Sequence, residues 1–448
     1  MKKLYSIILV TAIMVIASSC GSLLDLEPQQ SIADSDALNS DEKVKTVMIG
    51  AYSVMRNTAV YGGCLLRNSE LLAAGDEIAW VGTYNGPREI YNHQIIAANG
   101  DVTSQWVQSY RCISICNNVL SAIEIVNEDD RKVVEGEALF LRSLMYFDLV
   151  RFFAKSYEAS AANSQLGVPL VLTPTKEISE ANNVGRNTVD QVYAQVITDL
   201  TKAVTLLPKD NGVYANSGAA NALLARVYLQ KGDYAKARDA ASAVIESKTF
   251  SLNANYADVF NNVEYTSEDI FATKFTEQDG INQMTEFWST TEYGGRDGDI
   301  EILEDHLNLY DENDSRLAMF WEGNDAMRSG KWNEQYGLVN LFRLAEMYLI
   351  RAECNQRLGT SIGDTPLKDY NKIRVRAGLD AAQSVTLDNI LYERRLELAH
   401  EGFAIHDIKR LKHKTGGLNY NDSKLIFPIP EREMLANPGL KGQQNDGY

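Results

Sequence analysis

The sequence predicts a mainly α-helical protein whose helices pack in pairs, with only minor β-structure. Three observations support this fold class. Apolar residues recur at helical spacing over several long stretches, and the stretch 217–247 has the small and aromatic residues of a tetratricopeptide-like helix pair. Two long segments between the helices lack this periodicity. A chain of 448 residues, 45% of them hydrophobic, is also long enough to bury a large core.

The first 20 residues carry an export signal. Lys2 and Lys3 precede an apolar run from 7 to 17, and small residues stand directly before Cys20, as in a bacterial lipoprotein box. The run is shorter than the roughly 20 apolar residues that a membrane-spanning helix needs. We therefore expect a signal peptide at 1–19, lipidation of Cys20 and a lipidated tether at 20–40. Ordinary secretion without lipid is the alternative.

The helical part of the chain begins after the tether. Amphipathic helices are predicted at 41–56 and 105–126, where apolar residues recur every three or four positions. The stretch 135–154 is apolar on two sides, so this helix should be packed between others. The pattern resumes at 188–207 and stops at Pro208.

The clearest helix pair lies at 217–247. Its pattern of small and aromatic residues lets two helices nest and consists of Leu224, Ala225, Tyr228, Gly232, Asp233, Tyr234 and Ala237. The first-helix pattern returns at 344–348, and its partner helix is expected at 365–377. One such pair cannot bury its apolar face, so several pairs should stack. For any single pair, a generic helical hairpin is the alternative.

These helices define a scaffold within one domain that spans 41–448. The scaffold is expected at 41–60, 104–248 and 340–415. The segments 61–103 and 249–339 interrupt it with weak helical periodicity and many glycine, asparagine and aromatic residues. Long segments of this kind are commonly functional. We therefore expect them to form an irregular ligand-binding half.

The charge of the chain restricts its partners. Sixty acidic residues against 43 lysine and arginine residues give a net charge of -17. Such a surface repels phosphate backbones and anionic lipid headgroups. The sequence therefore argues against nucleic-acid binding and predicts contact with a membrane through the lipid anchor only.

The titratable side chains indicate neither a metal site nor catalysis. The four cysteines behind Cys20 are best explained as small buried hydrophobes, although their disulfide state stays open: Cys64, Cys112, Cys116 and Cys354. The five histidines lack zinc-binding spacing, and carboxylate pairs are expected by chance among sixty acidic residues. We predict no cofactor, no metal and no enzymatic activity.

Short motifs occur in order from the tether to the last residue. They include Leu23-Leu24-Asp25-Leu26-Glu27-Pro28, Tyr146-Phe147-Asp148-Leu149-Val150-Arg151, Ala222-Leu223-Leu224-Ala225-Arg226-Val227-Tyr228, Arg343-Leu344-Ala345-Glu346-Met347-Tyr348, Glu393-Arg394-Arg395, Glu401-Gly402 and Gln444-Asn445-Asp446-Gly447-Tyr448. Each motif is weak alone. Together they resemble the SusD/RagB family of outer-membrane nutrient-binding lipoproteins.

The resemblance implies a SusD-like fold and a setting for the protein. The fold would consist of four tetratricopeptide-like helix pairs packed against the irregular half. The protein would be lipid-anchored to the outer membrane and face the cell exterior. It would capture an oligosaccharide and deliver it to a SusC-type TonB-dependent channel, its expected partner. Some relatives capture peptide instead.

A sugar site needs aromatic planes for the C–H face of the ring and polar groups for its hydroxyls. The irregular segments supply six candidates: Trp80, Tyr84, Asn85, Trp288, Tyr293 and Arg296. Replacing Trp80 and Trp288 by alanine is expected to abolish glycan binding and to leave thermal stability almost unchanged. Capture of peptide and a tetratricopeptide scaffold for envelope assembly are the alternatives.

Overall fold

The computed structural model describes residues 37–175 and 182–448. The predicted signal peptide, Cys20 and most of the tether lie outside the described residues. Within them, no helix combines the length and the apolar character needed to cross a bilayer.

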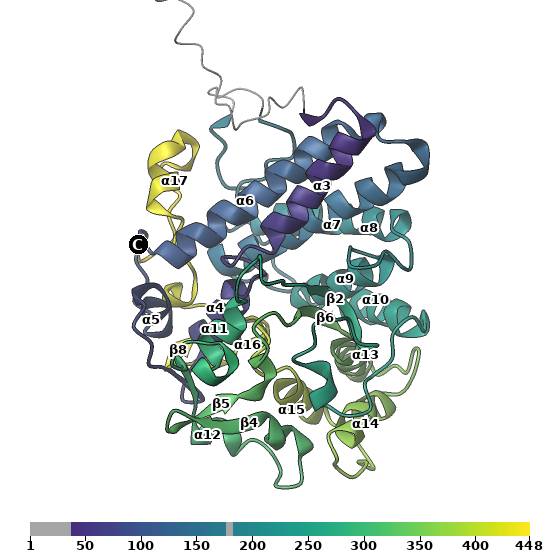
Figure 1. The fold of residues 1–448 in the computed structure, drawn as a ribbon, viewed down its shortest axis with the longest axis vertical. Coiled ribbons are helices and arrows are strands. Elements are labelled where there is room, and N and C mark those ends of the chain that lie inside the picture. The colour runs from purple at the N-terminus through teal and green to yellow at the C-terminus, as the bar shows by residue number, and fades with distance from the viewer. Residues whose placement is uncertain (1–36, 176–181) are drawn as a thin grey trace, which may run out of the picture.

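Eight of the described helices pack in four successive pairs (Figure 1). Within residues 37–175 and 182–448 these are α3 (Asp41–Met55) with α6 (Gly100–Ser121), α7 (Glu128–Phe153) with α8 (Val189–Leu206), α9 (Ser217–Lys231) with α10 (Tyr234–Glu246), and α13 (Leu344–Leu358) with α14 (Pro366–Arg376). Figure 1 shows the array running from α3 at the top to α14 at the bottom. The predicted mainly α-helical fold is confirmed.

Local sequence explains where these helices begin and how they pack. Nineteen of the 26 residues of α7 are buried, because α7 lies between α6 and α8, as its two apolar sides predict. Thr188 and Gln191 form a capping box at the start of α8. Gly232 takes a left-handed conformation (φ 77°) between α9 and α10, and Asp233 caps α10.

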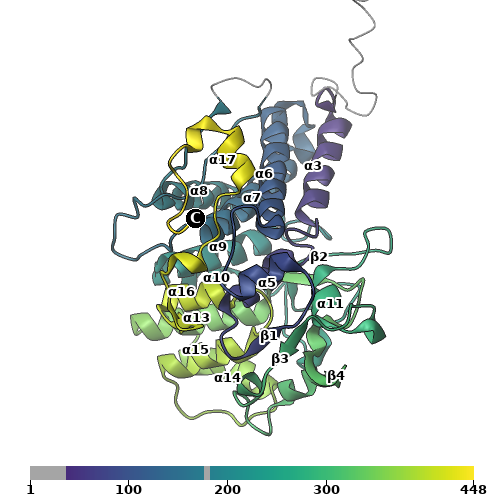
Figure 2. The same ribbon diagram turned by 90° about the vertical axis from the view of Figure 1, so that its left-hand side faces the viewer.

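A strand-rich half lies beside the lower part of the array (Figure 2). Its four-stranded antiparallel sheet has the order β1 (Ile78–Trp80), β3 (Ile300–Ile302), β5 (Ala326–Ser329) and β4 (Phe320–Gly323). A second antiparallel pair joins β2 (Asp269–Thr273) to β6 (Val339–Arg343), and β6 leads directly into α13. The remaining short elements are α11 (Gln283–Trp288), α12 (Glu304–Leu307), α15 (Leu387–Glu397), α16 (Ala404–Leu411), β7 (Lys414–Thr415), β8 (Leu418–Asn419) and α17 (Glu431–Ala436).

The segment 61–103, predicted to be irregular, contains two helices. These are α4 (Cys64–Ala73) and α5 (Asn85–Tyr91). All ten residues of α4 are buried, including polar ones such as Arg67 and Glu70. The helix is short, and its four consecutive polar residues 67–70 are buried against other elements instead of facing solvent, which only the tertiary structure establishes.

A buried network of ion pairs connects the strand-rich half to the helix pairs. Arg343, at the end of β6, pairs with Glu268 at 3.1 Å, with Glu401 at 2.7 Å and with Glu397. Arg376 of α14 pairs with Glu268 and Glu397 as well. Burial alone would raise the pKa of Glu397, yet the surrounding guanidinium groups hold this pKa well below its usual range. The network therefore depends on every charge having its partner.

The four cysteines of the described chain are buried and free. They are Cys64, Cys112, Cys116 and Cys354. Burial raises the pKa of the Cys64 thiol to about 11, which keeps it protonated at neutral pH. The prediction that these residues act as small buried hydrophobes is confirmed.

Candidate functional site

The structure divides the six predicted ligand-binding residues into buried and exposed groups. Trp288 is 0% exposed and Trp80 is 7% exposed, so neither ring presents a face to a ligand. The prediction that these two tryptophans contact the ligand is wrong. Both rings pack in the hydrophobic core, Trp288 with its centroid 4.8 Å from that of His400. Tyr84, Asn85 and Tyr293 are exposed, and Arg296 is partly exposed.

A depression of about 340 Å³ lies where Tyr84 and Asn85 reach the surface. It is formed by the start of α4, the start of α5, the first turn of α6 and α11. Figure 2 shows α5 and α11 close together on this side of the molecule. The side chains that line it with Tyr84 and Asn85 include Arg67, Asp101, Gln283, Glu286 and Phe287.

Arg296 holds the Tyr84 ring in place. Its guanidinium carbon lies 4.3 Å from the ring centroid, and Nη1 donates to the Tyr84 hydroxyl at 3.1 Å. The same guanidinium donates to Asp299 at 2.9 Å and to Thr83 at 3.3 Å. A ring that is 47% exposed would otherwise rotate freely, and these contacts fix its orientation.

The buried rings of Phe287 and Trp80 pack behind the exposed Tyr84 ring. Phe287 of α11 packs edge-on against Tyr84, with 5.9 Å between centroids, and at a tilted angle against Trp80, with 5.8 Å between centroids. The guanidinium of Arg67 lies 4.4 Å from the Phe287 ring centroid. Trp80 therefore contributes to the site as a support for the exposed ring.

The side-chain amide of Asn99 and the close approach at Gly82 position the loop that carries Tyr84 and Asn85. Asn99 caps α6, and its amide nitrogen donates to the carbonyl of Gly86 at 3.1 Å and to Glu89 at 2.7 Å. A Cβ atom on Gly82 would lie only 2.4 Å from Asp299, so only glycine allows this close approach. The loop is thus tied both to α6 and to the strand-rich half.

The charges of the depression are largely neutralised within it. Arg67, 1% exposed, pairs with Asp101, and Arg296 pairs with Asp299. Burial raises the pKa of Glu286 and of Asp299, an effect that Arg296 partly opposes. Ring face, amide groups and paired carboxylates suit a polyhydroxylated ligand. The described residues contain no group of three or more histidine, cysteine, aspartate or glutamate side chains that suits a metal ion.

Sequence reasoning missed most of the depression, because Tyr84 and Asn85 are the two of its ten lining residues that were predicted. Arg67, Asp101, Gln283, Glu286 and Phe287 were not predicted. The one available signal was an arginine inside the apolar run 64–73, a position where an unpaired charge would be costly. The other four come from segments whose proximity only the folded chain establishes.

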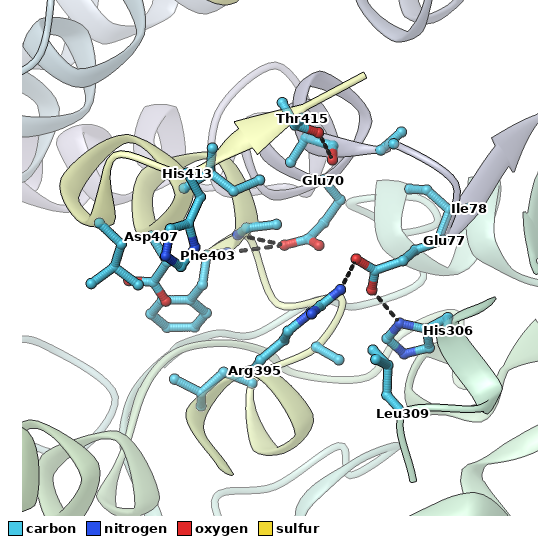
Figure 3. Close-up of a pocket in the computed structure, with 18 of the residues that line it drawn as sticks. Glu70, Glu77, Ile78, His306, Leu309, Arg395, Phe403, Asp407, His413 and Thr415 are labelled. Carbon is cyan, nitrogen blue, oxygen red and sulfur yellow. Dashed lines mark hydrogen bonds and ion pairs between the residues drawn. The ribbon is translucent and has the colours of Figure 1, made fainter. Parts of the chain in front are cut away.

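Tyr293 lies apart from the lining of the depression. It ends a short 3-10 helix, is 37% exposed and packs edge-on against Trp321 at 5.0 Å between centroids. A second and larger cavity, of about 670 Å³, lies between α4, α12, α15 and α16 (Figure 3). None of the six predicted residues lines it.

Comparison with known proteins gives consistent matches along the chain. A family model described as "Starch-binding associating with outer membrane" matches residues 22–229, and the model of the SusD family matches residues 247–425. The SusD-like protein P2 of Formosa agariphila is 25% identical over 98% of this chain and 99% of its own length.

Solved structures with the same fold include relatives from two Bacteroides species. A putative sugar binding protein from Bacteroides vulgatus superposes with a TM-score of 0.82 and 28% identity, over 92% of this chain and 99% of that one. A SusD superfamily protein from Bacteroides thetaiotaomicron superposes with a TM-score of 0.81 and 26% identity, over 91% of this chain and 99% of that one.

Proposed function

Because the chain belongs to the SusD/RagB family, we propose that it captures a nutrient oligosaccharide at the cell surface and delivers it to a SusC-type TonB-dependent transporter. One matching family model is described as starch-binding and associated with the outer membrane, and one similar solved structure is a putative sugar binding protein. Members of the SusD family are binding proteins, and the chain is one of them, not an enzyme. The ligand, the transporter and the outward orientation are the proposed part.

The depression at Tyr84 is the observation that carries the proposal. An exposed ring held by Arg296 offers an apolar plane, and Asn85, Gln283 and Glu286 offer hydrogen-bonding groups around it. This combination matches the apolar face and the hydroxyl rim of a sugar ring. Release to a transporter requires moderate affinity, which we expect to be millimolar to micromolar, or roughly -4 to -8 kcal/mol.

The anchor completes the proposed setting. Cys20 directly follows small residues, and acylation there would hold the protein to the outer membrane. Replacing Cys20 by alanine should move the protein from the membrane fraction to the soluble fraction. Retention in the membrane fraction would contradict lipid anchoring at this residue.

Two other functions remain as alternatives. A peptide-capturing lipoprotein would use the same depression, and its ligand would pair with Asp101 or Glu286 through basic groups. An assembly scaffold would use the helix pairs alone. The strand-rich half, with a formed depression and an exposed ring, favours capture over a scaffold role.

The test is glycan binding by variants of the depression. Tyr84→Ala and Asn85→Ala should weaken retardation in glycan affinity gels by at least tenfold, because they remove the apolar plane and an amide. Tyr234→Ala, a partly buried tyrosine on the helical scaffold, is the control and should bind like the wild type.

Two results would contradict the proposal. If Tyr84→Ala binds glycan like the wild type, the depression is not the site. If the wild type ignores every polysaccharide tested but binds members of a peptide library, the protein is a peptide-capturing lipoprotein instead.

A further inference from the structure

The larger cavity lies apart from the proposed glycan site and has a different lining. Its volume of about 670 Å³ falls within the range of about 300–1,000 Å³ typical of small-molecule sites. The end of α4, the residues before β1, and the helices α12, α15 and α16 surround it (Figure 3). Arg67 of α4 lines the depression, whereas Glu70, one turn later, lines this cavity.

Ion pairs and hydrogen bonds fix the polar wall of the cavity. Glu77 lies between two partners, with one oxygen 2.8 Å from Nδ1 of His306 and the other paired with Arg395 (Figure 3). Glu70 accepts hydrogen bonds from the backbone N–H groups of Gly402 and Phe403 at 2.8 and 2.9 Å. These side chains are held in place before any ligand arrives, which lowers the entropy cost of binding.

Tyr392 provides an aromatic plane at the cavity. Its ring is 43% exposed, and its hydroxyl donates to the carbonyl of Leu309, which bridges α15 to the segment after α12. In the part of the chain that the structure describes, no other ring or cation stacks on it, unlike Tyr84 with Arg296. Partly buried Leu391 and Ile408 extend the apolar wall.

The charge of the cavity selects against anions. Asp76, Asp305 and Asp388 are exposed around it and form no ion pair within the described residues. Lys414 and Arg395 are exposed cations of the lining, and the charge of Arg395 is paired with Glu77. An anionic ligand would be repelled. Arg394, 2% exposed and also part of the lining, has a guanidinium nitrogen, Nη1, without a hydrogen-bond partner among the described residues. A neutral ligand with oxygen acceptors fits both observations.

We propose that this cavity is a second saccharide site, which takes a neutral sugar of about disaccharide size against the Tyr392 ring. The ring and the aliphatic side chains contact the C–H face, and the Glu77 and Arg395 pair receives the hydroxyls. The site is separate from the depression at Tyr84, so the protein holds two saccharides at once.

The test uses the full soluble chain without its signal peptide and a Tyr84→Ala background, in which the depression lacks its ring. Maltose, cellobiose, lactose and xylobiose are the probes, measured by saturation-transfer NMR and calorimetry. At least one should bind with one site per chain. Adding Tyr392→Ala should weaken binding at least tenfold, whereas Tyr392→Phe, which keeps the ring, should stay within threefold.

Further measurements separate the loss of a ligand contact from misfolding and test the preference for neutral sugars. Circular dichroism checks whether Tyr392→Ala folds. If it folds poorly, Leu391→Trp, whose larger ring fills the space beside the apolar wall, takes its place and should weaken disaccharide binding at least tenfold. Galacturonic acid dimers should bind at least tenfold more weakly than the neutral probes. The proposal is overturned if no neutral disaccharide binds the Tyr84→Ala chain, if binding survives both cavity variants, or if the acidic dimer binds equally well. Because the background already lacks the Tyr84 ring, these outcomes are independent of the proposed function.

Discussion

Trp288 and Tyr84 should respond to alanine substitution in opposite ways. Trp288 is wholly buried in the core, and its replacement leaves a large cavity beside His400. Substitutions of this kind cost about 3–5 kcal/mol. Unfolding entropy is about 2.1 cal/mol/K per residue, or roughly 0.9 kcal/mol/K for 448 residues, so Tm should fall by about 3–5 °C.

Tyr84→Ala removes a half-exposed ring, which contacts Phe287 and Arg296. Exposed aromatic and cation–π contacts are each worth about 0.5–1 kcal/mol, so the loss of stability should be about 1–2 kcal/mol. The main effect of Tyr84→Ala should be weaker glycan binding. Trp288→Ala, measured where it is still folded, should retain binding.

Calorimetry and urea titration measure stability, and affinity gels measure binding on the same preparations. If Trp288→Ala unfolds at the wild-type midpoint and loses glycan binding, its ring is a ligand surface. The reasoning from burial would then be refuted.

Three further predictions concern buried charges. Arg343→Ala removes one cationic partner from each of three buried carboxylates and should cost about 3–5 kcal/mol in urea unfolding; a loss below 1 kcal/mol would contradict the role of the network. Burial lowers the pKa of Lys409 from 10.5 to about 7, and among the described residues its ammonium has only the Arg151 carbonyl, at 3.3 Å, as acceptor. Lys409→Met should therefore raise Tm; a fall would show that the ammonium is needed. Burial raises the pKa of Glu70 from 4.5 to about 7, so the folded state binds this proton more tightly and the Glu70 contribution to stability is lost as pH rises from 4.5 through 7. Glu70→Gln should therefore flatten the pH dependence of the urea midpoint over this range, and an unchanged slope would rule out this titration.

The helical array was predictable because its signals are local. Helical periodicity depends on residues three or four positions apart, and the Gly232 turn with its neighbouring small residues identifies a nesting pair without knowledge of the rest. α4 was missed because it is only ten residues long, so its local signal is weaker than that of the longer helices.

The family motifs also have a structural explanation. Arg343, Glu397 and Glu401 stand in or beside motifs recognised in the sequence, and all three are buried in the ion-pair network. Their pairing across segments more than 50 residues apart requires particular residue types, which leaves a recognisable pattern. The binding surface has no such requirement, so no motif marks it.

The sequence by itself determined the paired helices and the family, because each depends on residue order over short distances. The tertiary structure alone decided which aromatic rings face solvent. Trp80, Tyr84 and Trp288 look alike as sequence features, yet only Tyr84 reaches the surface. Exposure depends on what packs over a side chain. Phe287, about 200 residues further along the chain, packs against Trp80, and His400 packs against Trp288.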